Sequence, residues 1–244
     1  MATVTGCSYS QAESQVIADY DRILADKSVV KVSPPTDKRY HYAEKPNYDY
    51  FYSYHIPKST LEHFDVKEIT SIYVNGSLDA RSTKQNPIFG YPYPSGRMRV
   101  YRPTRPSDVK WGGNANGEDV SGIPQLKKRG VICFITSSTK DAMVLHQHGF
   151  SAISFNSETF GVRGDTAKIF ASVLSLLKLK FRYVVLFLDN DTAGITSANQ
   201  LGFKYNLKSI VTEEVKDISD YQKRYGVRKT SKKLKTWIKR AFSQ

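Results

Sequence analysis

The stretch that decides the fold is VVLFLDNDTAG, residues 184–194. Val184–Leu188 is an apolar run with β-branched and aromatic side chains, which predicts a buried strand. The strand runs directly into Asp189 and Asp191, and Thr192–Leu201 predicts a helix. An Asp that precedes a helix often caps it, which explains Asp191 but not Asp189. Because close carboxylates repel each other unless a cation lies between them, the pair also indicates a site for Mg²⁺.

The chain around this stretch alternates between strand and helix patterns. We expect strands at 131–136, 151–155, 184–188 and 209–213, and helices at 139–148, 166–179 and 192–203. This alternation predicts a parallel sheet with crossover helices, whose strands end at one ligand-binding edge. Acids from separate strand ends can then share one cavity. The acids that follow the predicted strands are Asp141, Glu158, Asp189, Asp191 and Asp217.

The part of the chain before Gly130 has a different pattern. Its short strands are separated by turn signals, among them Asn75-Gly76 and Pro94-Ser95-Gly96, and it is basic. Ser10–Asp26 predicts a helix, and the stretch that follows, up to residue 47, is rich in proline, charge and tyrosine, which predicts a linker. The sequence therefore predicts a β-rich basic part followed by an α/β part.

The charge of the chain favours a polyanionic partner, most simply nucleic acid. There are 36 Lys and Arg against 23 Asp and Glu, a formal net charge of +13. From Lys223 to the C-terminus there is no acid, while Leu234, Trp237, Ile238 and Phe242 recur at helical spacing. This predicts an amphipathic basic helix. A helix that lies on a membrane surface would show the same pattern.

The cysteines and the hydropathy exclude other classes of protein. Two distant cysteines, Cys7 and Cys133, can build neither a disulfide framework nor a C-x-x-C zinc site, so we expect no zinc. No long apolar span or signal peptide is visible, which predicts a soluble protein of the cytoplasm, or of the host cytoplasm if a phage encodes it.

Several ordered motifs resemble one family. ITSSTKDAMVLHQHGFSAISF, VVLFLDNDTAG and KDISDY resemble the Toprim domain of DnaG-type DNA primases, closest to the phage-like branch. Upstream, SGRMRVYRP, VKWGGN and LKKRG resemble the basic half of the primase core, and YHIPKSTLEHF resembles its helical opening. The resemblance implies a mixed α+β chain, in which a Toprim-like parallel sheet with flanking helices follows a basic β-rich subdomain. We expect an N-terminal helix and linker at 1–47, a primase-like subdomain at 48–128, a Toprim domain at 129–222 and a basic helix at 223–244.

The resemblance also implies a set of acidic site residues. Asp189 and Asp191 match the D-x-D metal ligands of the family, Asp141 matches the Asp of the first motif, and Asp217 falls in the acidic stretch after the sheet. The resemblance implies two divalent ions, Mg²⁺ or Mn²⁺, with Asp189, Asp191 and Asp217 as metal ligands and Asp141, Asp189 and Asp191 as catalytic residues. The spacing of Asp141 after Ser138 is also close to a capping box, in which the carboxylate would only satisfy helix N–H groups.

One position departs from the family pattern. The expected Glu-Gly after the first strand is Ser137-Ser138, and a serine cannot act as ligand or general base at neutral pH without help. Glu158, at the end of the adjacent strand, can fill the gap as ligand and base, or it is an exposed loop acid. Ser137 and Ser138, at a helix N-terminus, can bind a phosphate.

The basic half contributes the expected contacts with template or nucleotide phosphates. The resemblance implies Arg97, Lys110 and Asn114, which match residues of that half, and Arg99 and Lys140 are further candidates.

The resemblance implies a DNA primase catalytic core that makes short RNA primers on single-stranded DNA by metal-dependent nucleotidyl transfer from ribonucleoside triphosphates. The sequence shows neither a zinc ribbon nor a P-loop, so we expect a separate template-recognition element and a replicative helicase as partners, and no membrane. Two alternatives remain. One is a catalytically inactive Toprim module that binds nucleic acid or serves a helicase as an accessory protein. The other is a Toprim nuclease, which the basic β-rich half disfavours.

Overall fold

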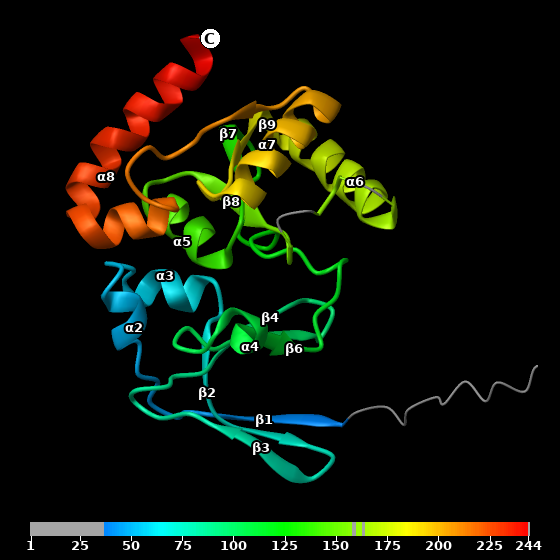
Figure 1. Ribbon diagram of the computed structural model, residues 1–244, viewed down its shortest axis with the longest axis vertical. Helices are drawn as coiled ribbons and strands as arrows, with labels where there is room; N and C mark the ends of the chain where they lie inside the picture. The colour runs from blue at the N-terminus through cyan, green and yellow to red at the C-terminus, as the bar shows by residue number, and fades with distance from the viewer. Residues whose placement is uncertain (1–36, 158–159, 163, 244) are drawn as a thin grey trace, which may run out of the picture. The chain divides into compact units, whose positions relative to one another are not determined.

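The computed structural model describes residues 37–157, 160–162 and 164–243 (Figure 1). The chain divides into two compact units, Met1–Asp37 and Lys38–Gln244, and the description below concerns the second. The helix predicted at Ser10–Asp26 and the candidate residue Glu158 lie outside the described residues.

The first half of the described chain forms an antiparallel sheet. Its strands are β1 (Lys38–Tyr42), β2 (Lys67–Val74), β3 (Ser77–Arg81), β4 (Phe89–Pro92), β5 (Met98–Tyr101) and β6 (Trp111–Gly113). They follow the order β1-β2-β4-β5-β6, and β3 pairs with β2. Asn75 and Gly76 join β2 to β3 with positive φ angles of 51° and 81°, as a two-residue hairpin turn requires. Three short helices belong to this half: α2 (Asp49–Tyr52), α3 (Lys58–His63) and α4 (Ser107–Lys110).

The prediction of a linker up to residue 47 is wrong for Lys38–Tyr42. Lys38–Tyr42 forms β1, which pairs antiparallel with β2 from Lys38 opposite Val74 onward. The stretch KRYHY alternates partly covered and exposed residues, which suits an edge strand, although the prolines and charges before it favoured a linker.

The second half forms the predicted parallel sheet. Its strands are β7 (Gly130–Thr136), β8 (Ser151–Ser154), β9 (Phe181–Phe187) and β10 (Lys208–Ser209), in the order β10-β9-β7-β8, and every pair is parallel. The helices are α5 (Thr139–Gln147), α6 (Gly164–Lys180), α7 (Thr192–Tyr205) and α8 (Ile218–Ser243). Because β8 and β9 flank β7 on opposite sides, the strand order reverses at β7, and a ligand crevice is expected at the carboxyl end of that strand.

The strand predicted at 209–213 is much shorter than expected. Pairing with β9 ends soon after Ser209, with a bond from the Ile210 N–H to the Leu186 carbonyl. Thr212 then turns the chain by donating its hydroxyl to the Val215 carbonyl at 2.5 Å. The turn brings Lys216 and Asp217 back towards the edge of the sheet.

The parallel sheet has an apolar core on each face, because its side chains alternate between the two faces. On one face Phe134 and Phe187 join the residues of α5 and α8 and the aromatic residues of the first half, among them Phe51 and Phe89. The other face packs against α6 and α7. The two halves of the described chain therefore share one core.

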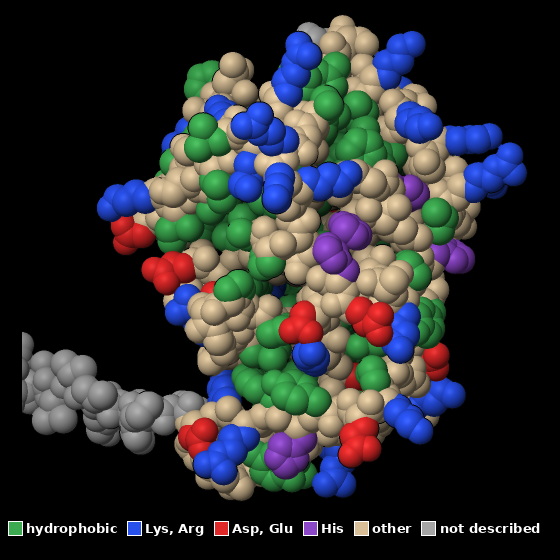
Figure 2. All heavy atoms as spheres, turned by 180° about the vertical axis from the view of Figure 1, so that it is seen from behind, with side chains coloured by type: hydrophobic (Ala, Val, Ile, Leu, Met, Phe, Trp, Pro, Cys, Tyr) green, Lys and Arg blue, Asp and Glu red, His purple; other side chains and the backbone are tan. Residues whose placement is uncertain are grey.

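The basic helix at the C-terminus is confirmed as amphipathic. It starts at Ile218, so the expected boundary at residue 223 falls inside α8, and Gly226 kinks it with φ 76° and ψ 166°. Leu234, Trp237 and Ala241 are buried against the parallel sheet. Lys and Arg side chains predominate in Figure 2 over the part of the molecule that holds α8 and the parallel sheet. None of the helices in the described ranges is long and apolar enough to cross a membrane.

Trp237→Ala should lower the free energy of unfolding by about 3–5 kcal/mol, the range for removing a buried Trp. Trp237 is 3% exposed, and its ring lies 5.0 Å from that of Tyr221 and 5.7 Å from that of Phe187. Urea unfolding measures the change, and Lys235→Ala on the exposed side of α8 is the control, with a change within about 0.5 kcal/mol. A loss below 1 kcal/mol for Trp237→Ala would show that α8 is not part of the core.

Candidate active site

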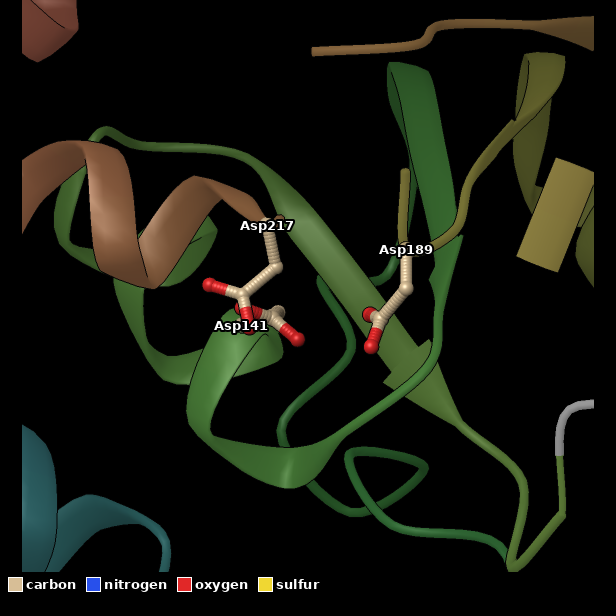
Figure 3. A group of neighbouring side chains, drawn as sticks. All are labelled: Asp141, Asp189 and Asp217. Carbon is tan, nitrogen blue, oxygen red and sulfur yellow. The ribbon is translucent and has the colours of Figure 1, made fainter. Parts of the chain in front are cut away.

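Three carboxylates meet at the carboxyl edge of the parallel sheet. Asp141 lies in the first turn of α5, Asp189 follows β9, and Asp217 precedes α8; Figure 3 shows their side chains pointing toward one another. One oxygen from each lies within 4.8 Å of the others. In the described part of the chain this is the one place where three or more His, Cys, Asp or Glu side chains converge in this way.

Asp141 is held from both sides. Ser138 caps α5 by accepting the Asp141 N–H at 3.2 Å, and its hydroxyl donates to the Asp141 carboxylate at 2.5 Å. The Ser219 N–H, in the first turn of α8, donates to the other carboxylate oxygen at 3.2 Å. Burial, and then the charges of Asp217 and Asp189, raise the pKa of the Asp141 carboxyl well above its usual value. Ser138 caps α5, as the capping-box spacing predicted, but the Asp141 carboxylate accepts the Ser138 hydroxyl and the Ser219 N–H of α8, and it lies beside Asp189 and Asp217.

Contacts of the Asp189 N–H and carbonyl groups position this residue. Its N–H donates to the Ser137 hydroxyl at 3.0 Å, so the serine in the place of the family's Glu orients the D-x-D loop. A Cβ on Gly194 would lie 2.2 Å from the Asp189 carbonyl oxygen, so the approach of α7 to the loop requires glycine here. Burial and the charge of Asp217 raise the pKa of the Asp189 carboxyl.

Asp217 caps the N-terminus of α8. Its carboxylate accepts the Ser219 hydroxyl at 2.6 Å and the Asp220 N–H at 2.7 Å. The same α8 turn therefore orients Asp217 and, through the Ser219 N–H, Asp141.

Asp191 lies outside the group of three. Its carboxylate caps α7 by accepting the Gly194 N–H at 2.9 Å, and this bond, followed by one from Lys216, lowers the pKa of Asp191. The capping role expected for Asp191 is thus confirmed, and its role as a metal ligand stays a prediction.

Two lysines neutralise part of the negative charge. Burial by itself lowers the pKa of Lys140, but the charges of Asp217 and Asp141, together with the neighbouring Tyr101 and Tyr54, outweigh this effect, and the pKa of Lys140 is raised. Its Nζ lies 3.8 Å from the centroid of the Tyr54 ring and 3.9 Å from an Asp220 oxygen. Lys216 places its Nζ 3.1 Å from Asp189 and 2.9 Å from Asp191.

Asp189 and Asp217 line a cleft of about 750 Å³ between the two halves of the described chain, and Asp141 lies buried beside them. Its lining combines aromatic and cationic side chains with the acids: Tyr50, Tyr54, Tyr91, Arg99, Tyr101, Lys110, Trp111, Lys140, Lys216 and Lys223. The Trp111 ring stacks on Tyr101 with centroids 4.5 Å apart. A cleft with cations, flat aromatic walls and a carboxylate edge suits a ligand with phosphates and bases.

The predicted phosphate-binding residues separate into two groups. Arg99 lines the cleft, where it donates to the Asn156 side chain at 2.9 Å, and Lys110 and Lys140 line it too, as do Ser137 and Ser138. The other two have partners elsewhere. The Arg97 guanidinium bonds Asp119 at 2.7 Å, and the Asn114 side chain accepts the Met98 N–H at 2.7 Å. Their contact with nucleic acid stays a prediction.

The sequence reasoning missed Lys216 and the tyrosines of the cleft wall. Lys216 had one usable signal, since it directly precedes Asp217. Tyr50 and Tyr54 lie four residues apart, which indicates a shared helix face but not what that face lines. Tyr101 lies two residues after Arg99 and so on the same face of β5.

Gly194→Ala should weaken Mn²⁺ binding about 10-fold or more, the scale of a lost supporting contact behind a metal ligand. The added methyl would displace the Asp189 carbonyl, and with it the carboxylate. Calorimetric titration with Mn²⁺ gives the affinity, and Gln200→Ala, on the exposed side of α7, is the control. Equal Mn²⁺ affinity in Gly194→Ala and the wild type would contradict this account of Asp189.

Comparison with known proteins identifies the fold. No protein-family model and no curated protein matches the sequence. Among solved structures, the chain is similar to the primase fragment of the bacteriophage T7 primase-helicase, with 14% identity and a TM-score of 0.53, over 81% of this chain and 75% of that one. It is also similar to the RNA polymerase domain of the Mycobacterium tuberculosis primase DnaG, with 14% identity and a TM-score of 0.52, over 77% of this chain and 71% of that one. The chain therefore has the fold of primase catalytic domains, which confirms the fold that the sequence motifs predicted.

Proposed function

We propose that this chain is the catalytic core of a DNA primase, which joins ribonucleotides into short primers on single-stranded DNA. The observation that carries the proposal is the convergence of Asp141, Asp189 and Asp217 in a primase fold. They lie at the edge where open α/β sheets bind ligands, and two of them, Asp189 and Asp217, line a cleft with cations and aromatic rings.

The donor set fits a divalent cation. Carboxylate oxygens are the ligands that Mg²⁺ and Mn²⁺ favour, and three of them lie close together here. Burial, and then the charge of Asp217, raise the pKa of both Asp141 and Asp189, so the ionised carboxylates are unfavourable without a cation. A bound cation would relieve this repulsion, lower the pKa of an attacking 3′-hydroxyl and offset charge on the triphosphate. Asp141, Asp189 and Asp217 would hold it, and Asp191 and Glu158 are further candidate ligands.

The other residues of the cleft would bind and orient the substrates. Lys140 and Lys216 lie beside the carboxylates and can bind the triphosphate. Arg99 and Lys110, on the opposite wall, can bind the template or nucleotide phosphates, and the N-terminus of α5 at Ser137 and Ser138 can bind a further phosphate. The proton of the attacking hydroxyl needs an acceptor, and Glu158, which follows β8 in the sequence, is our candidate for this role.

The proposed partners follow from the same reading. One structural neighbour is part of a primase-helicase, and the other was solved with a DNA duplex that has a 6-nucleotide overhang. We infer that this chain uses a single-stranded DNA template and ribonucleoside triphosphates. We also infer that it acts with a replicative helicase and a separate template-recognition element.

A second candidate function is a module that binds nucleic acid without catalysis. The observation that favours it is Ser137, which stands where the Toprim pattern has Glu and whose hydroxyl is occupied by the Asp189 N–H. Primer synthesis by the wild-type chain separates the two functions.

Asp189→Asn should reduce primer synthesis about 100-fold or more, the scale of removing a group that stabilises transition-state charge. The assay measures incorporation of labelled ribonucleotides on single-stranded templates with Mg²⁺ or Mn²⁺. Asp165→Asn, an exposed acid of α6, should synthesise at the wild-type rate. Synthesis at the wild-type rate by Asp189→Asn would remove the catalytic proposal. DNA binding without synthesis by the wild type would favour the binding module.

The same assay tests Glu158. Glu158→Gln should lower synthesis about 100-fold or more, as expected for loss of a general base, with little change in DNA binding. Ser137→Glu in that background should restore part of the activity, because it returns a carboxylate to the family position. If Glu158→Gln works at the wild-type rate, Glu158 is a surface acid.

The exposed cations of α8 should contribute nonspecific affinity for single strands. Replacing Arg228, Lys232, Lys235 and Lys239 with Gln leaves the buried side of α8 intact, as well as the ion pairs of Lys233 and Arg240 with Glu213. Each lost phosphate contact should lower the slope of log affinity against log salt concentration by about 0.7. Fluorescence anisotropy measures the slope, with Lys58→Gln plus Lys168→Gln as the control. An unchanged slope would assign this surface to another partner.

A further inference from the structure

Lys216 occupies the space between the two acids of the D-x-D pair. Its Nζ lies 3.1 Å from Oδ2 of Asp189 and 2.9 Å from Oδ2 of Asp191. A cation that bridged these two carboxylates would have to contact the same oxygens, and the ammonium group and the cation cannot share that space.

The backbone of Lys216 is fastened to the same loop. Its carbonyl accepts the N–H of Asn190, the residue between the two acids, at 2.6 Å, and it also accepts the Thr212 hydroxyl at 3.3 Å. The Lys216 side chain is 52% exposed. The backbone from which it extends is nevertheless fixed beside Asp189 and Asp191 by these hydrogen bonds. The next residue, Asp217, belongs to the carboxylate group. The segment Lys216-Asp217 thus supplies both a carboxylate of the group and a lysine ammonium beside it.

The ligands at the carboxylate edge favour a single divalent cation. Asp141, Asp189 and Asp217 offer one oxygen each within 4.8 Å of one another. In a two-metal site the ions lie about 3.5–4 Å apart, so a second ion would need further ligands close to this group. Here Asp191 is already occupied by Lys216 and by the Gly194 N–H.

We propose that Lys216 takes the place of a second metal ion. In this arrangement Asp141, Asp189 and Asp217 bind one divalent cation, and the Lys216 ammonium is the second positive charge that faces the triphosphate in the cleft. This inference rests on the proposed function, because it assumes that the carboxylates bind a metal. It goes further by assigning the number of ions and a role for Lys216, to which the sequence analysis assigned none.

The test counts bound Mn²⁺ by electron paramagnetic resonance of the free ion, with the full chain and without DNA. The wild type should bind one Mn²⁺. Lys216→Met, which removes the charge and keeps a flexible apolar chain, should bind two. Lys216→Gln is a second variant in case Lys216→Met does not fold, and thermal unfolding followed by circular dichroism checks both.

The control separates occupancy from overall charge. Lys223 lines the same cleft, with its Nζ 4.6 Å from the Tyr54 ring centroid, and makes no ion pair with Asp189 or Asp191 within 4.0 Å. Lys223→Met should keep one Mn²⁺.

Two bound Mn²⁺ in the wild type, or one in both Lys216 variants, would overturn the inference, as would a second Mn²⁺ in Lys223→Met. A wild type that binds no Mn²⁺ would instead contradict the metal centre of the proposed function itself.

Discussion

Repulsion between Asp141, Asp189 and Asp217 is the interaction that the rest of the site must overcome. Their oxygens lie within 4.8 Å of one another, and Asp141 and Asp189 are buried, so ionising them costs free energy. The pKa values of both are raised for this reason. A fold that gained nothing from the charges would place apolar or neutral residues there. The arrangement is understandable if a cation, and then a charged substrate, completes it.

Each carboxylate is held against this repulsion by a backbone feature. Ser138 and the start of α8 hold Asp141, the close approach of Gly194 positions Asp189, and Asp217 is fixed as the cap of α8. Because α8 contributes to two of the three and packs through Trp237 onto the core, the site depends on packing far from the cleft. The aromatic residues of the first half join the same core, which keeps the opposite wall of the cleft in place.

Much of the fold of the second half could be predicted from the sequence, because the apolar residues of its strands and helices recur at regular spacing. The parallel sheet, its crossover helices and the convergence of Asp141 with Asp189 follow from strands that end at one edge. The position of Lys216 could not be predicted, because loop side chains have no period, and the turn at Thr212 that brings Lys216 back shortened a predicted strand. The edge strand β1 was missed because the residues before it favour a linker. Arg97 and Asn114 matched a motif, yet Arg97 bonds Asp119 and Asn114 accepts the Met98 N–H, which sequence spacing does not reveal.

The central claim is that the fold brings three carboxylates together to hold a divalent cation. Crystals of the full chain soaked in Mn²⁺ and measured at the manganese absorption edge test it most directly. The account predicts one anomalous peak within bonding distance of Asp141, Asp189 and Asp217, with Lys216 still between Asp189 and Asp191. A map with no peak among these carboxylates, at a Mn²⁺ concentration that supports activity, would contradict it.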